Sequence, residues 1–274
     1  MATRKSPLRR VGAPLAGGVV MLALLAAATA ALGAEPHRLL PDIVTMRIHS
    51  GDLKVESSNG TAQLRLTNRI ANKGRGPLEI FPSAKSHGCD GDGDPDNDRD
   101  AIQRVFLDAN GDRVFERKTD TDSEHFTFGC DRYDPRAHHW DVFNLARYEL
   151  RRLHSGKTVA KASKVAFCTV DSDPAFPWLP GSPNGPYYPR DGCDDTSILG
   201  VSVGWADEYY YGLPGQALNI TGLKAGRYCL VSIGDPSNLL RESNNSNNRR
   251  RTRIELRPAE HVVKTLPRPC RIRR

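Results

Sequence analysis

The sequence has little of what marks a membrane-spanning or repetitive protein. It contains only 3 Met and 3 Trp, aromatic residues make up 7% of the chain, and no internal repeat stands out. No apolar run reaches the roughly 18 to 20 residues that a membrane-spanning helix needs. The residues after position 34 contain no long low-complexity linker, so they predict one domain that is large enough to bury its own core.

The longest apolar stretch lies near the start of the chain, from Val19 to Leu32. Four basic residues precede it, and small residues follow it as far as Ala34. This order is typical of a secretory signal peptide, which we predict over residues 1–34. The protein is therefore expected to be secreted or extracytoplasmic. An uncleaved membrane anchor is the alternative.

The chain has six cysteines, but none of them forms a C-x-x-C motif. In an exported protein this pattern favours three disulfides over thiolate metal sites. Cys168 and Cys193 bracket the loop that leads to Tyr209, so we expect them to pair. The pairs Cys89 with Cys130 and Cys229 with Cys270 then follow by elimination, although six cysteines allow fifteen connectivities.

The net charge of +7 is unevenly distributed. Residues 1–34 carry a net +4, and residues 249–274 carry ten Lys and Arg against two Glu. Subtracting that +4 and +8 from the total leaves −5 for residues 35–248. An acidic body attracts cationic, lysine-bearing substrates, and a basic tail over residues 257–274 attracts anionic cell-surface polymers. A solvated terminus is the alternative for the tail, and nucleic acid is not expected as a partner of an exported protein.

Short runs of β-branched and apolar residues recur between turn signals, which is the pattern of strands. The segment from His139 to Leu150 also alternates like a strand. Asn110-Gly111 predicts a hairpin, because both residues tolerate the positive φ of a type I′ turn. We therefore predict a mainly β protein, a β-sandwich with long disulfide-stapled loops and little helix. The other expected strands are Gln63 to Ala71, Leu78 to Phe81, Ile102 to Leu107, Arg113 to Glu116, Val165 to Val170, Leu218 to Ile220, Tyr228 to Ile233 and Thr252 to Leu256.

Two segments resemble parts of a known enzyme family. Lys164 lies in the sequence ASKVAFC at residues 162–168, and Tyr209 closes the sequence GWADEY at residues 204–209. Both settings are similar to the lysyl oxidase family, in which a lysine and a tyrosine cross-link into a quinone. The resemblance implies that Lys164 and Tyr209 form a lysine tyrosylquinone with the help of copper. It also implies oxidation of primary amines, including peptidyl lysine.

Similarity to this family covers most of the chain after the predicted signal peptide. It begins at LPDI (residues 40–43) and ends at Glu242 followed by Asn247-Asn248. Each short match is weak, but their order along the chain is specific. We therefore expect a lysyl-oxidase-like domain over residues 35–256, followed by the basic tail.

The copper-binding segment departs from the family pattern. Where the family has His-x-His-Trp/Tyr-His, this chain reads AHHWD at residues 137–141. In a strand this spacing places three side chains on one face, which here are Ala137, His139 and Asp141. The resemblance implies a copper site at His139 and Asp141, with His138 as a further candidate. One imidazole and one carboxylate favour zinc, manganese or calcium over copper.

Asp207 is a candidate catalytic base. It stands two residues before Tyr209, so both side chains point to the same face of an extended segment. A positioned carboxylate can accept the proton that amine oxidation releases from the substrate carbon. A surface carboxylate in a turn is the alternative. Without copper, Lys164 and Tyr209 are also compatible with an ordinary strand lysine and a buried tyrosine.

A second oxygen-rich segment runs from Asp90 to Asp100. Alternating carboxylates suit a hard cation such as calcium. The candidate ligands are Asp90, Asp92, Asp94, Asp96 and Asp98. The segment is not an EF-hand, because Pro95 stands where that loop has glycine. A solvated acidic loop is the alternative.

The sequence is compatible with two functions. The first is a secreted, copper-dependent amine oxidase of the lysyl oxidase type, supported by the Lys164 and Tyr209 settings. The second is a non-catalytic secreted relative that serves as a binding or structural protein, supported by Ala137 and Asp141.

Overall fold

The computed structural model of the protein describes residues 37–86, 88–89, 98–134, 139–189 and 198–270, without the side chains of residues 85, 86, 134, 139, 143 and 163–167. The chain from His37 onward forms one compact unit. The predicted signal peptide lies outside the described residues. Within the described part of the chain, no helix is long and apolar enough to cross a membrane.

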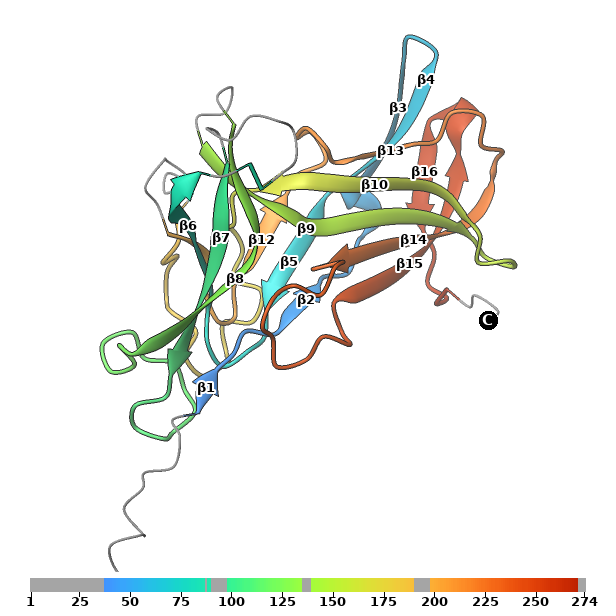
Figure 1. Ribbon diagram of the computed structural model, residues 1–274. Coiled ribbons are helices and arrows are strands. Elements are labelled where there is room, and N and C mark those ends of the chain that lie inside the picture. Colours follow the sequence, from blue (N-terminus) through green and yellow to red (C-terminus); the bar gives the residue numbers. More distant parts are fainter. Residues whose placement is uncertain (1–36, 87, 90–97, 135–138, 190–197, 271–274) are drawn as a thin grey trace, which may run out of the picture. The chain divides into compact units, whose positions relative to one another are not determined.

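The described chain is built almost entirely from strands, which confirms the predicted mainly β class (Figure 1). Two short 3-10 turns, η1 (Ser50–Asp52) and η3 (Pro258–Glu260), accompany them. The strands are β1 (Arg38–Leu39), β2 (Ile43–Thr45), β3 (Leu53–Ser58), β4 (Thr61–Leu66), β5 (Asn68–Asn72), β6 (Leu78–Ser86), β7 (Asp98–Leu107), β8 (Ser123–Asp134), β9 (His139–Arg152), β10 (Thr158–Phe167), β11 (Leu199–Val201), β12 (Ala206–Tyr209), β13 (Ala217–Asn219), β14 (Gly226–Gly234), β15 (Arg249–Arg257) and β16 (Val262–Thr265).

The strands pair antiparallel in one large sheet and two small ones. The large sheet has the order β11-β6-β7-β8-β9-β14-β15-β16, with β1 added beside β7 and β10 beside β9. The small sheets have the orders β12-β5-β2 and β13-β4-β3. Figure 1 shows the long strands β9 and β10 running side by side. Large and small sheets enclose a common core, as the predicted sandwich requires.

Each sheet contributes apolar side chains to that core. Tyr148 and Leu230 come from the large sheet, Ile43 comes from one small sheet, and Leu64 and Leu218 come from the other. All five are less than 9% exposed. Burial of such side chains is the main favourable term in folding, at roughly 25 cal/mol per Å² of apolar surface.

The large sheet also has a second buried layer, on the face turned away from the core. Side chains alternate between the two faces of a strand, so Leu230 of β14 enters the main core while its neighbour Val231 faces the other way. Cys229, Val231 and Ile233 form a small cluster on this outer face, with Leu153 and Cys270 packed against it. The two faces of the large sheet are therefore distinct environments.

Two predicted disulfides are confirmed. Cys89 is bonded to Cys130, and Cys229 is bonded to Cys270. Cys168 is also disulfide-bonded, and its predicted partner Cys193 lies outside the described residues. The second bond fixes the end of the predicted basic tail, because it joins Cys270 to strand β14.

The predicted hairpin at Asn110-Gly111 is wrong. Residues 113–116 are not a strand, and β7 pairs instead with β8, which begins at Ser123. Only Gly111 of the two turn residues has positive φ, so a type I′ turn is not formed. Two buried carboxylates hold this loop in place. Asp108 accepts a hydrogen bond from Gly111 N at 2.7 Å, and Asp120 accepts one from Glu116 N at 2.8 Å.

The expected strand from Gln63 to Ala71 is two strands in different sheets. β4 ends at Leu66 and pairs with β3 and β13, whereas β5 starts at Asn68 and pairs with β2 and β12. Thr67 separates them, and its N–H donates to the Asp52 carbonyl instead of a neighbouring strand. An apolar run by itself does not reveal a change of sheet.

Candidate functional site

Tyr209 ends strand β12 and is partly buried against the main core. β12 pairs with β5, which places Tyr209 opposite Asn68. Its hydroxyl donates a hydrogen bond to the Cys168 carbonyl oxygen at 2.7 Å. Tyr209 is therefore attached to the segment that follows β10, the strand on which Lys164 lies.

The surroundings of the Tyr209 hydroxyl disfavour its ionised form. Burial is the largest cause that raises the pKa of Tyr209 well above its ordinary value, and the nearby charges of Asp207 and Asp141 raise this pKa further. Tyr209 is thus a neutral phenol at physiological pH. Asp207 and Asp141 are far apart in the sequence, yet the charge of each raises the pKa of the same tyrosine.

Asp207 is 2% exposed and lies in β12 with Tyr209. Their separation by two residues puts both side chains on the same side of the strand, as the sequence predicted. The Asp207 charge also acts on Tyr148, although burial is the larger cause of the raised pKa of Tyr148. The Tyr148 hydroxyl donates to Gln216 Oε1 at 3.0 Å. The core face of the large sheet therefore contains a buried polar cluster next to Tyr209.

The altered metal segment opens strand β9. Asp141 is 8% exposed, and its backbone lies opposite that of Arg132 in the neighbouring strand β8. The ring of Trp140 packs against Tyr133 and beneath the guanidinium of Arg99. Ala137, His138 and the side chain of His139 lie outside the described residues. Within the described set, Asp141 is the predicted metal ligand that the structure brings to Tyr209.

Sequence reasoning missed a second carboxylate in this region, Asp131 of β8. It is completely buried, and its two oxygens accept no hydrogen bond from a described residue. Burial raises the pKa of Asp131 to about 7, the charge of Asp141 raises it as well, and Arg99 lowers it. Strand β8 was not anticipated, so no alternation pattern could have shown that Asp131 is buried within reach of the Asp141 charge.

These donors do not match a site of three imidazoles. Ala137 has no side-chain ligand atom, and the carboxylate of Asp141 stands where the family pattern has histidine. Imidazole suits copper(II), whereas carboxylates suit harder ions such as manganese or calcium. We therefore assign no catalytic step to copper. Elsewhere in the described chain, Cys89, Asp98 and Cys130 group their ligand atoms, but both sulfurs are in a disulfide.

Lys164 lies in strand β10, with its backbone opposite Ala146 of β9. Its side chain is outside the described residues. The pairing of the two strands shifts between Lys164 and Ala166, and Asn144 on the β9 side has a left-handed backbone with φ 61°. This irregularity is a β-bulge, a feature often found next to active sites because it redirects a side chain.

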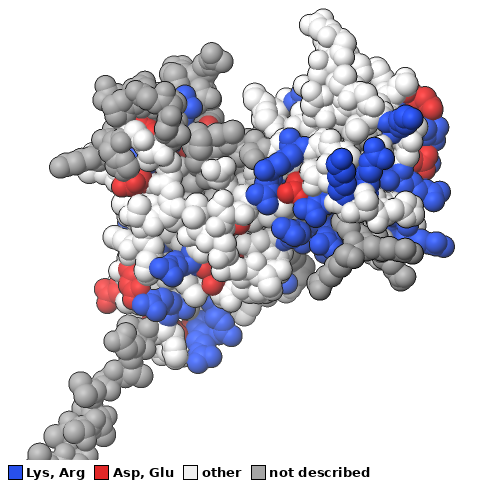
Figure 2. All heavy atoms as spheres, turned by 45° about the vertical axis from the view of Figure 1, so that its right-hand side comes forward, with Lys and Arg blue, Asp and Glu red and all other residues white. Residues whose placement is uncertain are grey.

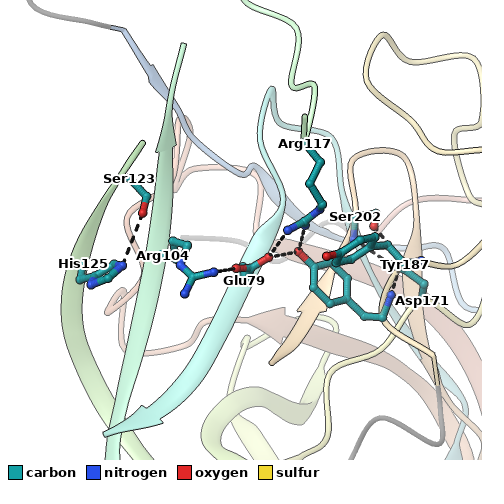
Figure 3. A network of polar contacts seen from close by, with 9 residues as sticks. Glu79, Arg104, Arg117, Ser123, His125, Asp171, Tyr187 and Ser202 are labelled. Atoms are coloured by element: carbon teal, nitrogen blue, oxygen red, sulfur yellow. Dashed lines mark hydrogen bonds and ion pairs between the residues drawn. The ribbon is translucent and has the colours of Figure 1, made fainter. Parts of the chain in front are cut away.

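A buried ion-pair network holds the chain that follows Lys164 in place (Figure 3). Glu79 of β6 is completely buried, and the guanidiniums of Arg104 and Arg117 reach it at 2.6 and 2.9 Å. The Tyr188 hydroxyl also donates to Glu79, at 2.6 Å. Asp171 accepts from the backbone N–H groups of Tyr188 and Ser202. The loop from Cys168 to Tyr188 is thus tied to the large sheet.

Of the five candidate calcium ligands, Asp98 is the one that the structure describes. Asp98 begins β7, is completely buried, and accepts from Gly88 N at 3.2 Å. It also lies beside Cys130 of the first disulfide. Asp90, Asp92, Asp94 and Asp96 are outside the described residues, so calcium binding remains a prediction.

Comparison with known proteins identifies the family of the chain. The profile of the family described as Lysyl oxidase matches residues 119–265, which is more than half of the chain and includes Asp141, Lys164 and Tyr209. Protein-lysine 6-oxidase of Gallus gallus is 32% identical over 111 residues. That match covers 40% of this chain and 24% of the relative, so the two share only part of their lengths. The chain belongs to the lysyl oxidase family.

Proposed function

We propose that this protein oxidises primary amines, with the lysine side chains of other proteins as its substrate class. The reaction converts an amine, oxygen and water into an aldehyde, ammonia and hydrogen peroxide. The observation that carries the proposal is the setting of Tyr209, whose hydroxyl is held at the Cys168 carbonyl next to Asp207 and Asp141. Family membership supports the same function.

Lys164 and Tyr209 are the residues from which a lysine tyrosylquinone would form. Such a quinone supplies the carbonyl that condenses with the amine and accepts its two electrons. The protein would then contribute positioning and proton transfer. The Cys168 carbonyl fixes the direction of the Tyr209 hydroxyl, and the buried ion pairs of Glu79 fix the loop that begins at Cys168.

Asp207 is proposed as the base that accepts the proton from the substrate carbon. It is buried, close to Tyr209, and belongs to the same strand. The charge of Asp141 gives the surroundings of Tyr209 a negative potential, which attracts the protonated amine of a lysine side chain. We place the metal at His139 and Asp141, with His138 as a further ligand, so that a carboxylate stands where the family pattern has a third imidazole.

Localisation outside the cytoplasm fits the disulfides. Cys89–Cys130, Cys229–Cys270 and the bonded Cys168 require an oxidising compartment to persist. We therefore propose that the protein is secreted or extracytoplasmic, as its lysine-bearing substrates would be.

The altered metal segment favours a second candidate function. Ala137 removes one ligand, and Asp141 replaces another. A chain with this segment could keep the fold and its disulfides while serving as a non-catalytic binding or structural protein. The two functions make opposite predictions for amine turnover.

Amine turnover is tested by hydrogen peroxide release from the purified protein after exposure to copper(II) or manganese(II). The substrate is a lysine-containing peptide, and the matched control is the same peptide with dimethylated lysine. Dimethylation keeps the positive charge but removes the N–H groups that condensation requires. Peroxide release from the first peptide alone supports the oxidase. No release with either metal, under conditions that activate an authentic lysyl oxidase, would support the non-catalytic function.

A further inference from the structure

A groove of about 810 Å³ lies on the outer side of the large sheet, away from Tyr209. Strand β15, the loop between β14 and β15, and the chain that follows β16 form its walls. Figure 2 shows Lys and Arg side chains gathered on the side of the molecule to which β14, β15 and β16 belong in Figure 1. Six arginines line the groove: Arg47, Arg249, Arg250, Arg251, Arg253 and Arg268.

These arginines are not neutralised by the rest of the described chain. None of the six forms an ion pair with a described residue, whereas Arg147 and Arg151 of the neighbouring strand β9 both pair with Glu149. The groove contains one carboxylate, Asp235. Its two oxygens accept the backbone N–H groups of Leu239 and Leu240, at 2.9 Å each, and so make no ion pair with the arginines.

The arginines are held in a row by the sheet. β15 lies between β14 and β16, and Arg249, Arg251 and Arg253 alternate with the buried side chains of Thr252 and Ile254. Alternate residues of a strand are about 6.8 Å apart, because each residue advances it by about 3.4 Å. The three guanidiniums therefore form a regular line of positive charge on a rigid support.

A disulfide secures the opposite wall. Cys270 is bonded to Cys229, whose side chain is fully buried on the outer face of β14. Leu266 N also donates to the Arg253 carbonyl at 2.8 Å. These two attachments place Arg268, from the part of the sequence predicted to be a tail, across the groove from β15. The basic terminus is thus part of a built surface.

We propose that this groove binds a linear anionic polysaccharide carrying sulfate or phosphate groups. Guanidinium forms paired hydrogen bonds with such oxyanions, and a row of arginines matches a polymer with repeated charges. None of the described residues that line the groove is aromatic, so the unpaired bases of a single-stranded nucleic acid would find nothing to stack on. Val231 and Leu230 face opposite sides of the sheet, so a bound polymer leaves the core face free.

The test measures binding of the full-length protein to dextran sulfate and to polyphosphate across a range of salt concentrations. Arg249→Gln/Arg250→Gln/Arg251→Gln is compared with Lys118→Gln/Arg152→Gln/Lys161→Gln, which removes three exposed positive charges outside the groove. The first variant is expected to weaken binding at least tenfold and to reduce the slope of log affinity against log salt by about two, at about 0.7 per lost contact. The control is expected to change affinity less than twofold.

A second variant, Arg47→Gln/Arg268→Gln, tests the two lining arginines that lie outside β15. It should weaken binding as well, since both line the same groove. Thermal melting confirms that each variant is folded, and comparison of the two polymers tells whether sulfate or phosphate is preferred. Equal losses in the groove and control variants would overturn the proposal, because net charge alone would explain them. Equal affinity for single-stranded DNA and for dextran sulfate would overturn the choice of polymer.

Discussion

The two faces of the large sheet differ in the sign and the exposure of their charges. On the core side of this sheet, the buried carboxylates Asp207 and Asp141 lie near a neutral tyrosine, Tyr209. The outer face presents arginines to solvent along β15. A buried charge changes the ionisation of its neighbours, whereas an exposed row of charges acts on partners from solution. The difference indicates that the proposed amine oxidation belongs to the core face and the proposed polymer binding to the outer face.

The change with the largest expected effect is Tyr209→Phe. We expect peroxide release to fall below detection, because the residue proposed to become the cofactor is lost, while dextran sulfate binding stays unchanged. Loss of the hydrogen bond to Cys168 should lower the free energy of unfolding by about 1 kcal/mol. The measurements are peroxide release, polymer binding and urea denaturation.

Tyr228→Phe is the matched control for this change. Tyr228 is buried in the same core, and its hydroxyl also donates to a backbone carbonyl at 2.7 Å, that of Lys224. This variant should lose similar stability but keep its activity. Equal loss of activity in the two variants would show that Tyr209 matters only for the fold.

Glu79→Ala should have the next largest effect, on stability. It leaves Arg104, Arg117 and the Tyr188 hydroxyl without their shared buried partner. Removing one member of a buried ion pair costs about 3 to 5 kcal/mol, which urea denaturation would detect. Glu124→Ala breaks the exposed pair with Arg38 and should leave stability nearly unchanged. Similar effects for both would contradict the role given to burial.

A smaller effect is expected from restoring the family's metal ligands. Ala137→His/Asp141→His should tighten copper(II) binding by about two orders of magnitude, since even groups one shell from a metal change affinity 10- to 100-fold. Isothermal titration with copper(II) and with manganese(II) measures this, and manganese binding should weaken in the same variant. No change for either metal would show that residues 137 and 141 do not hold the metal.

The fold class could be predicted from the sequence, because the alternation of apolar and polar residues along a strand is a local property. The two confirmed disulfides were reached by elimination after Cys168 was paired with Cys193, and no local pattern specifies them. The path of the chain between strands was harder to predict from the sequence. The loop after β7 depends on Asp108 and Asp120, whose buried carboxylates bind backbone N–H groups, and Asn110-Gly111 pointed to a hairpin instead. Side-chain hydrogen bonds to the backbone can thus replace a turn that the local sequence favours.

In the candidate site, too, some residues were predictable from the local sequence and others were not. Tyr209 and Asp207 were predictable together, because they lie two residues apart on one strand. Asp131 was not, since its importance depends on its burial in β8, a strand whose pairing with β9 brings Asp131 within reach of the Asp141 charge. The groove was equally hidden, because it requires the disulfide between Cys229 and Cys270 to bring Arg268 across from β15.

The central claim is that the core face carries the oxidase chemistry through Lys164 and Tyr209. Mass spectrometry of the copper-exposed protein, digested with trypsin without reduction, tests it most directly. We predict a cross-linked peptide that contains both residues and is absent from Tyr209→Phe. Separate and unmodified Lys164 and Tyr209 peptides, under conditions that build the cofactor in an authentic lysyl oxidase, would contradict the claim.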